Sequence, residues 1–326
     1  MRRRSAAALT ALTALTAALV TGCGSDDEPD PLRSQQWAID ALKLPDAWGT
    51  AKGEDTVIAV VDSGVDPGHP DLKGRLVDGY DFVDGDDDPK DLNGHGTHVA
   101  GIAAAHTDNG VGIAGGARGA RIMPVRVLGA DGSGSDANIT KGIVWAAQNG
   151  ADVINLSLGE SGLMARLLKG GVLNDAISVA NGKGAVVVAA AGNDSTLLQP
   201  YEVDTPVLVV NAADRNGQPA DFTNFGAQDA VAAPGVDILS TLPTYTAKET
   251  LKNTTGYGKL SGTSMASPYV SAVAALLHQQ GLSPAEIMRT IRDTAVNPAN
   301  NLKLGLGNVD ASAAVRAAGK TAAGDK

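Results

Sequence analysis

The sequence predicts a three-layer α/β domain in which helices cover both faces of a mostly parallel, twisted sheet. Two observations carry this prediction. Short runs of small and β-branched apolar residues alternate along the chain with segments of helical pattern. The apolar runs are nearly continuous, which is typical of strands that are buried on both faces. The runs lie at residues 57–61, 122–127, 153–156, 185–190 and 207–210, and the helical segments at 95–106, 138–149, 164–180, 264–280 and 283–295.

Composition limits both the core and the partners. The chain has 326 residues, 40 glycines and only 3% aromatic residues, so its core must be packed closely from small side chains. The formal net charge of -10 gives no electrostatic basis for binding nucleic acid. Cys23 is the only cysteine, which excludes an intramolecular disulfide and a cysteine-based zinc site. We expect a monomer.

The first residues have the features of a signal peptide. Arginines occupy positions 2–4 and an apolar stretch follows at 6–20, a length that suits a cleaved signal better than a membrane span. The stretch ends in Val20-Thr21-Gly22-Cys23, which resembles the bacterial lipobox, where the chain is cut before a cysteine that carries lipid. We therefore expect Cys23 to anchor the protein at the outer face of the cytoplasmic membrane, because two acyl chains bind a bilayer stably. An ordinary cleaved signal, giving an extracellular protein, is the alternative.

The expected domain boundaries follow from polar composition. Residues 1–22 form the signal peptide. Residues 23–33 carry the lipidated cysteine and, being rich in Asp, Glu and Pro, predict a flexible linker that spans about 35 Å when extended. The folded domain is expected over 34–317, followed by a disordered tail at 318–326.

Three motifs contain the residues that can carry chemistry. An acid ends a strand in Val60-Val61-Asp62-Ser63-Gly64, and a histidine opens a helix in Asn93-Gly94-His95-Gly96-Thr97-His98. A serine opens another helix in Ser261-Gly262-Thr263-Ser264-Met265-Ala266-Ser267-Pro268. Sites in parallel sheets form beyond the carboxyl ends of strands, so the three motifs can converge. Taken singly, each also has a structural interpretation, as a turn aspartate, a structural or metal-binding histidine pair, and a helix N-cap serine.

Together, in the order Asp, His, Ser, the motifs resemble the subtilisin family of serine proteases, and most closely its subtilisin and thermitase branch. The resemblance extends from residue 36 to about residue 315. It implies a catalytic triad in which Ser264 attacks the scissile carbonyl, His95 accepts and returns the proton, and Asp62 orients the imidazole. It also implies a serine endopeptidase that acts on extended protein segments through an acyl-enzyme.

The same resemblance supplies the remaining substrate contacts. The segment Ala189-Ala190-Ala191-Gly192-Asn193 matches the one that carries the oxyanion-hole asparagine, so Asn193 is the implied donor, although alone it would be read as a turn residue. Two further segments match those that hold the substrate strand from either side. They are Gly132-Ser133-Gly134 and Ser157-Leu158-Gly159.

Two acidic regions suggest structural calcium, because hard cations prefer several oxygen ligands at short range. A loop with Asp81, Asp84, Asp86 and Asp88 resembles a calcium loop of the thermitase branch, and a solvated acidic loop is the alternative. The second candidate resembles a calcium site of the family. It consists of Asp71, Asn109 and the backbone carbonyls near Val111 and Ile113.

Some features depart from the family pattern. Only about ten residues separate Cys23 from the apparent mature start, where the family usually has a folding prodomain, so we expect unaided folding or help from another chain. Tyr269 stands where histidine is common and Ala272 where glycine is common, and we expect only packing adjustments. Two rival functions remain open: a catalytically silent, peptide-binding lipoprotein, and a calcium-dependent adhesion or structural protein.

Overall fold

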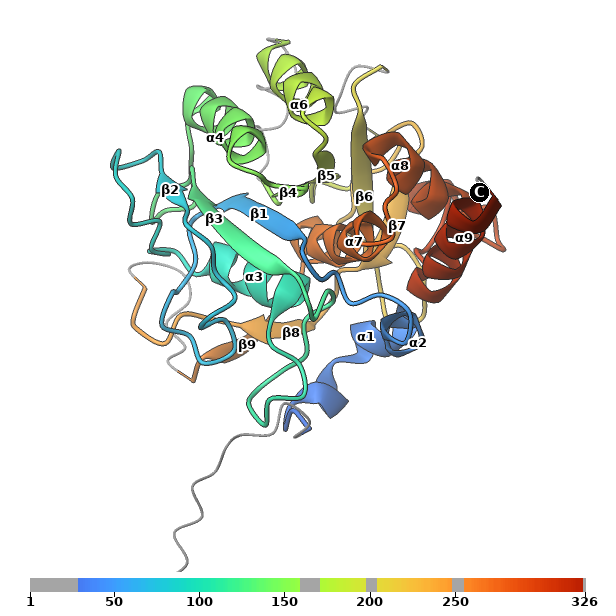
Figure 1. Ribbon diagram of the computed structural model, residues 1–326, viewed down its shortest axis with the longest axis horizontal. Coiled ribbons are helices and arrows are strands. Elements are labelled where there is room, and N and C mark those ends of the chain that lie inside the picture. The colour runs from blue at the N-terminus through green and yellow to red at the C-terminus, as the bar shows by residue number, and fades with distance from the viewer. Residues whose placement is uncertain (1–28, 159–170, 198–203, 248–254, 325–326) are drawn as a thin grey trace, which may run out of the picture.

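The computed structural model describes residues 29–158, 171–197, 204–247 and 255–324 (Figure 1). Its elements in chain order are η1 (Arg33–Gln35), α1 (Trp37–Ala41), α2 (Leu44–Trp48), β1 (Val57–Asp62), β2 (Tyr80–Asp81), α3 (His95–Ala104), β3 (Arg121–Arg126), α4 (Asp136–Gln148), β4 (Val153–Leu156), α6 (Val172–Gly182), β5 (Val186–Ala190), β6 (Val207–Ala213), β7 (Val231–Pro234), β8 (Ile238–Thr241), β9 (Tyr257–Leu260), α7 (Thr263–His278), α8 (Pro284–Asp293), η2 (Leu302–Leu304) and α9 (Ala311–Gly324).

Seven strands form one sheet in the order β2-β3-β1-β4-β5-β6-β7, and every strand pair in it is parallel. From β1 the chain builds the sheet first toward β3 and then, on the other side, toward β4. Open parallel sheets place their binding sites at such a reversal of strand order, beyond the carboxyl ends of the strands. Asp62 is the last residue of β1, so it lies at this point.

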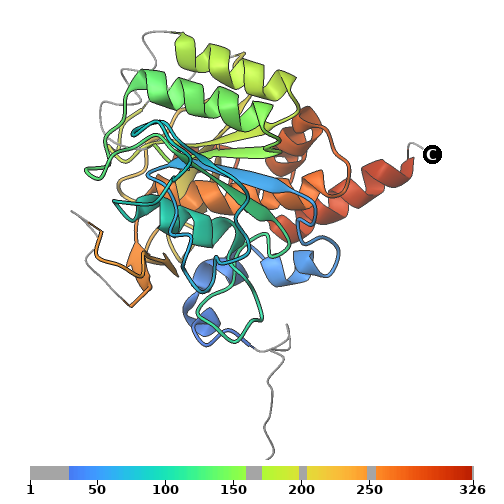
Figure 2. The same cartoon turned by 60° about the vertical axis from the view of Figure 1, so that its left-hand side comes forward.

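Helices cover both faces of the sheet, which confirms the predicted three-layer α/β architecture (Figure 1 and Figure 2). α4 and α6 pack on one face, and α3 and α7 pack on the other. Within β1, Ile58 and Val60 belong to the core cluster under α3 and α7, whereas Ala59 and Val61 belong to the cluster under α4 and α6. The continuous apolar run therefore serves two cores with alternate side chains.

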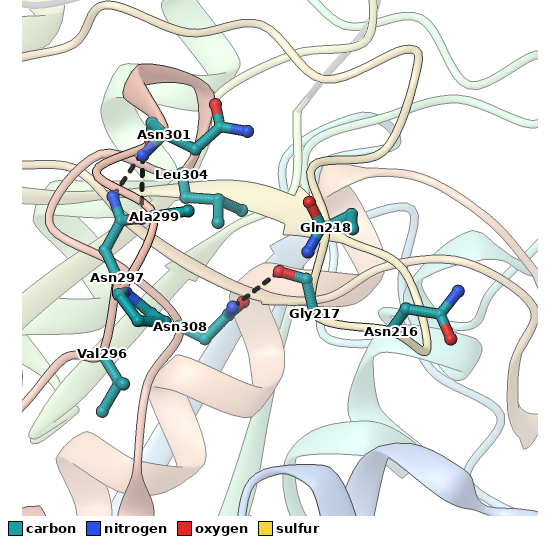
Figure 3. Close-up of a pocket in the computed structure, with 10 residues that line it drawn as sticks. Asn216, Gly217, Gln218, Val296, Asn297, Ala299, Asn301, Leu304 and Asn308 are labelled. Atoms are coloured by element: carbon teal, nitrogen blue, oxygen red, sulfur yellow. Dashed lines mark hydrogen bonds between the residues drawn. The ribbon is translucent and has the colours of Figure 1, made fainter.

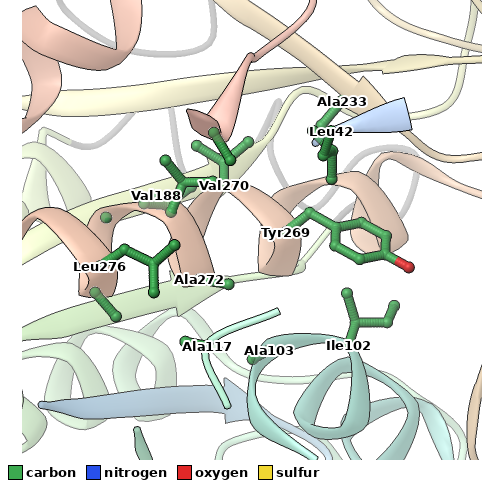
Figure 4. Close-up of a cluster of buried hydrophobic side chains, with 14 of the residues drawn as sticks. Leu42, Ile102, Ala103, Ala117, Val188, Ala233, Tyr269, Val270, Ala272 and Leu276 are labelled. Carbon is green, nitrogen blue, oxygen red and sulfur yellow. The ribbon is translucent and has the colours of Figure 1, made fainter. Parts of the chain in front are cut away.

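α7 is the central helix of one core, and every residue from Thr263 to Leu277 in it is buried. Figure 4 shows its small side chains facing those of α3 and of the segment before β3. A methyl group on Gly116 would lie 2.6 Å from Cβ of Ala272, so Gly116 leaves just enough room for the alanine that replaces the family's common glycine. Tyr269, with 1% of its surface exposed, packs in the same cluster as Ile102. Both departures from the family pattern are thus accommodated by packing.

The ends of the folded part lie further out than we expected. Asp30 and Leu32, which we had assigned to the flexible linker, are held by the domain, since Leu32 N–H donates to the Gly112 carbonyl at 2.7 Å and Asp30 is buried. At the other end, α9 continues to Gly324, beyond residue 317, because its alanine-rich sequence favours a helix and Ala318 is fully buried. No helix among the described residues is long and apolar enough to cross a membrane.

Candidate active site

Asp62 and His95 are directly paired. Nδ1 of His95 lies 2.8 Å from Oδ1 of Asp62, and the backbone N–H of Ser63 donates to the same oxygen at 2.7 Å. The carboxylate is completely buried at the end of β1, and its Oδ2 has no hydrogen-bond partner among the described residues. A buried negative charge so placed fixes the imidazole with Nδ1 as the donor and Nε2 facing away.

Glycines on both sides of His95 make this pairing possible. Gly94, the residue before α3, has φ of 113°, a left-handed conformation that favours glycine. A Cβ on Gly96 would lie 2.1 Å from the carbonyl oxygen of Gly64 and 3.2 Å from Cβ of Asp62. The start of α3 therefore approaches the end of β1 more closely than any larger residue would allow.

Ser264 lies in the first turn of α7 and is 5% exposed. Its hydroxyl donates to the carbonyl of Ser157 at 3.2 Å, and Ser157 directly follows the end of β4. β1 and β4 are neighbours, with Val61 opposite Leu156. The structure therefore brings Ser264 to the same edge of the sheet as the paired Asp62 and His95.

Asn193 is fixed against the start of α7. Its Oδ1 accepts hydrogen bonds from the backbone N–H of Thr263 at 2.9 Å and from the Thr263 hydroxyl at 3.1 Å. Because Oδ1 is occupied in this way, the amide presents Nδ2, which can only donate, beside the turn that carries Ser264. Gly192 reaches this position with φ of 100°, and a side chain there would collide with Asn224.

The two expected substrate segments lie on either side of β1. Ser157 and Leu158 follow β4, and Gly159 lies outside the described residues. Gly132, Ser133 and Gly134 belong to the loop after β3, which closes through a hydrogen bond from Gly129 N–H to the Ser133 carbonyl. This loop is tied to the histidine motif, since Asn93 Nδ2 donates to the Ala130 carbonyl at 3.1 Å. The described parts of both segments therefore flank the carboxyl end of β1, where Asp62 lies.

An arginine binds two carboxylates of the acidic segment that begins at the end of β2. Nη1 of Arg126 lies 2.5 Å from Oδ2 of Asp81 and 2.6 Å from Oδ2 of Asp84, whereas Asp86 and Asp88 are exposed. Within the described parts of the chain, no group of three or more His, Cys, Asp or Glu residues is placed to hold a metal ion. The four aspartates that we expected to form a calcium loop are thus not gathered around one point, because two of them face the buried guanidinium.

The second candidate calcium region is more compact. Asp71 is buried and accepts hydrogen bonds from Asn109 Nδ2 at 3.1 Å, from Ile113 N–H at 2.9 Å and from the Tyr257 hydroxyl at 3.0 Å. Burial raises the pKa of Asp71 to about 6, and the charge of Asp30 contributes in the same direction.

Asp30 is a residue of this region that the sequence did not reveal. Its carboxylate accepts hydrogen bonds from the N–H groups of Asp108 and Asn109 at 2.9 and 3.0 Å, and burial raises its pKa as well. Two buried carboxylates and nearby loop carbonyls supply oxygens of the kind that Ca²⁺ prefers, whereas Asn109 points its Nδ2 at Asp71 and its Oδ1 accepts from the Val111 N–H at 2.9 Å. The residues present therefore fit a calcium ion here better than in the loop after β2.

A separate cavity of about 250 Å³ lies between the turn at 216–218 and the loop at 296–308 (Figure 3). None of the candidate catalytic residues lines it. Its asparagines mainly hold the two loops together, since Asn297 Nδ2 donates to the Asn301 and Gly305 carbonyls and Asn308 Nδ2 to the Gly217 carbonyl. We therefore assign this cavity no part in catalysis.

Comparison with known proteins decides the family. A family model described as the subtilase family matches residues 53–312. The chain belongs to the subtilase family. This subtilase is 44% identical over 263 residues to thermitase from Thermoactinomyces vulgaris, with 80% of this chain and 88% of thermitase covered. It is also 48% identical over 254 residues to a thermophilic serine proteinase from Bacillus sp. (strain AK1), covering 76% of this chain but only 59% of that protein's length.

Solved structures give the same result for the fold. A protease from Pseudoalteromonas arctica superposes with a TM-score of 0.79 at 36% identity, covering 90% of this subtilase and 99% of that chain. A cold-adapted subtilisin-like serine proteinase superposes with a TM-score of 0.65 at 33% identity, with coverages of 80% and 88%. The fold is subtilisin-like, and the chain is a subtilisin-like serine peptidase, as its sequence predicted.

Proposed function

We propose that this subtilase is an endopeptidase of the outer cell surface, which hydrolyses extended protein segments with Ser264, His95 and Asp62 and is tethered through a lipid on Cys23. The observation that carries the proposal is the 2.8 Å contact between His95 Nδ1 and Asp62 Oδ1, at the sheet edge where Ser264 begins α7. A neutral serine hydroxyl is a weak nucleophile, and a histidine held in this way is the base that it needs.

The chemistry then proceeds through an acyl-enzyme. His95 Nε2 takes the proton of Ser264 as Oγ attacks the carbonyl carbon, and the C–N bond breaks as the same proton passes to the leaving amine. Water then gives a proton to His95 Nε2 as its oxygen attacks the acyl carbon, and the bond from that carbon to Ser264 Oγ breaks as the proton passes to Oγ, which releases the acid. Asp62 keeps the proton on Nδ1 and stabilises the imidazolium. Asn193 Nδ2 and the N–H of Ser264 stabilise the oxyanion, and loss of the corresponding asparagine in subtilisin itself costs about 2.7–4 kcal/mol.

We further propose a structural calcium ion held by Asp30, Asp71, Asn109 and the carbonyls near Val111 and Ile113. The ion would neutralise two buried carboxylates and so stabilise the fold without taking part in the reaction. The support is the donor set itself, because among the described residues neither carboxylate is bound by a buried arginine, as Asp81 is by Arg126.

A serine-directed fluorophosphonate probe tests the proposed activity. The purified protein should be labelled, Ser264→Ala should abolish labelling, and Asp62→Asn should slow it by several orders of magnitude because an amide favours the wrong tautomer of the imidazole. Absence of labelling in a buffer with calcium would favour a peptide-binding or adhesion role instead. Membrane fractionation of the protein and its Cys23→Ala variant tests the tether separately, since only the former should stay with the membrane.

A further inference from the structure

A second buried carboxylate, that of Asp91, lies next to the turn that carries His95. Asp91 is completely buried, and the catalytic steps above make no use of it. Its two oxygens accept hydrogen bonds from one side chain at the end of β1 and from several groups at the start of α3. The donors to Oδ1 are Ser63 Oγ at 2.9 Å, Asn93 N–H at 3.0 Å and Gly94 N–H at 2.7 Å, and those to Oδ2 are Thr97 N–H at 2.9 Å and Thr97 Oγ1 at 2.6 Å.

Ser63 connects this carboxylate to both partners of the catalytic pair. Its backbone N–H donates to Oδ1 of Asp62, the oxygen that also receives His95. Its hydroxyl donates to Asp91 and accepts from the backbone N–H of Gly96 at 3.0 Å. Ser63 thus bonds to both carboxylates, those of Asp62 and Asp91, and to the backbone of the residue after His95.

An ionised carboxylate can accept all of these hydrogen bonds. Each of the donors is an N–H or O–H group, and an amide at position 91 would turn its own NH₂ toward one set of them. Burial raises the pKa of Asp91 above its ordinary value, and the hydrogen bonds from Thr97, Gly94 and Ser63 offset this only in part. These donors replace part of the hydration that a buried charge loses.

The charge also has an electrostatic consequence for the reaction. His95 is the first residue of α3, where the positive end of the helix dipole disfavours an imidazolium. Peptide hydrolysis by this site requires that imidazolium. A carboxylate that is bonded to the N–H groups of the same first turn reduces the positive field there.

From these contacts we propose that Asp91, acting with Ser63, is a positioning residue that fixes the imidazole-bearing turn of α3 against the Asp62 end of β1. The proposal rests on the proposed function, because it concerns the same reaction. Asp91 does not touch the reacting atoms. It acts through the orientation of His95.

The test uses Asp91→Asn and Ser63→Ala, with Asp66→Asn as the matched control. Asp66 is a buried carboxylate of the same β1–α3 connection, but its oxygens bind Gly68 and Thr244 and not the start of α3. We expect both test variants to lower kcat at least about tenfold with little change in KM, since small displacements of a catalytic group cost rate more than binding. The control should lose thermal stability and keep kcat.

Proton NMR provides a readout that does not depend on activity. The Nδ1 proton of His95 that bonds to Asp62 should give a low-field signal in the wild type and the control, and this signal should shift or broaden in Asp91→Asn and Ser63→Ala. An unchanged signal and an unchanged kcat in both test variants would overturn the proposal. If Asp91→Asn does not fold, Ser63→Ala decides alone. If the wild type shows the signal but never reacts with the fluorophosphonate, the proposed function is wrong. The NMR signals of the variants then still decide whether Asp91 and Ser63 position His95.

Discussion

The side chains of Ser157 and Ser264 each donate a hydrogen bond to the backbone carbonyl of the other. The Ser264 hydroxyl reaches the Ser157 carbonyl at 3.2 Å, and the Ser157 hydroxyl reaches the Ser264 carbonyl at 2.9 Å. Pro268 explains the second bond. It stands four residues after Ser264 in α7 and has no N–H, so the Ser264 carbonyl lacks its intrahelical donor and the Ser157 hydroxyl replaces it.

This pair is part of a buried polar network between β4 and α7. Asn155 donates from Nδ2 to Ser157 Oγ at 2.9 Å, and its Oδ1 accepts from the hydroxyls of Ser267 and Ser271, both at 2.9 Å. The network holds the turn that carries Ser264 against the end of β4. The proton of Ser264 also has a carbonyl acceptor in this arrangement, and it must turn from there toward the imidazole for the reaction to begin.

The first prediction concerns Ser157→Ala. Removing its hydroxyl leaves the Ser264 carbonyl and Asn155 Nδ2 without partners, so we expect kcat to fall by about tenfold, or about 1.4 kcal/mol in the activation barrier. Steady-state kinetics on a protein substrate measures this. Ser271→Ala is the control, because it removes an equally buried hydroxyl while Ser267 still bonds to Asn155. Equal kcat values for the two variants would contradict the argument.

The second prediction concerns Gly96→Ala. The added methyl group would lie 2.1 Å from the Gly64 carbonyl, so β1 and α3 must separate and the Asp62–His95 contact must lengthen. We expect a loss of melting temperature together with a loss of kcat beyond about 100-fold, as for other displacements of about 1 Å in catalytic geometry. Gly182→Ala in α6, where a Cβ would have no neighbour within 4 Å, should be neutral or slightly stabilising.

The third prediction separates the two candidate calcium regions. Chelation should lower the melting temperature of the wild type by several degrees, because an ion at about 100 times its Kd stabilises the native state by about 2.7 kcal/mol. Asp30→Asn and Asp71→Asn should shrink this difference. Asp86→Asn should leave it unchanged, since Asp86 is an exposed residue of the loop in which Arg126 binds Asp81 and Asp84. If Asp86→Asn removed the effect of the chelator on the melting temperature and Asp30→Asn and Asp71→Asn did not, the ion would lie in the loop after β2 instead.

The fourth prediction concerns pH and His98. This imidazole is completely buried, and burial lowers its pKa from 6.5 to about 3. The unfolded chain therefore protonates this imidazole below pH 6.5, whereas the folded chain does so only near pH 3. Stability is lost as pH falls from 6.5 toward 3. The contribution has a slope of up to about 1.4 kcal/mol per pH unit. His98→Gln should reduce the slope of the unfolding free energy against pH by this amount between about pH 6.5 and 4. Denaturant titration at several pH values measures that slope. If the unfolding free energies of the wild type and His98→Gln fall with the same slope as pH decreases, the neutral state that we assign to buried His98 is wrong.

The strands of the core could be predicted from sequence because their side chains are apolar whatever surrounds them. β7 could not, since its Val-Ala-Ala-Pro sequence is too short and contains a proline. β8 and β9 form a separate antiparallel pair, which could not be predicted because most of β9 is only half buried. Catalytic candidates were predictable as motifs. Contacts between distant segments were not predictable: Asp30 is buried because its carboxylate binds the N–H groups of Asp108 and Asn109. The buried ion pair of Arg126 with Asp81 did leave a sign in the sequence, since an arginine stands inside an apolar run.

The attachment of Asp30 and Leu32 to the domain has a consequence for a lipid-anchored form. From Cys23 to Asp30 there are only seven residues, which reach about 25 Å when fully extended. This is close to the radius of a domain of this size, which has a radius of gyration of about 19 Å. The enzyme would then keep one side toward the bilayer, and Ser264 would lie at a nearly constant height above the membrane. Surface proteins would be cut according to how far their exposed segments stand above the membrane.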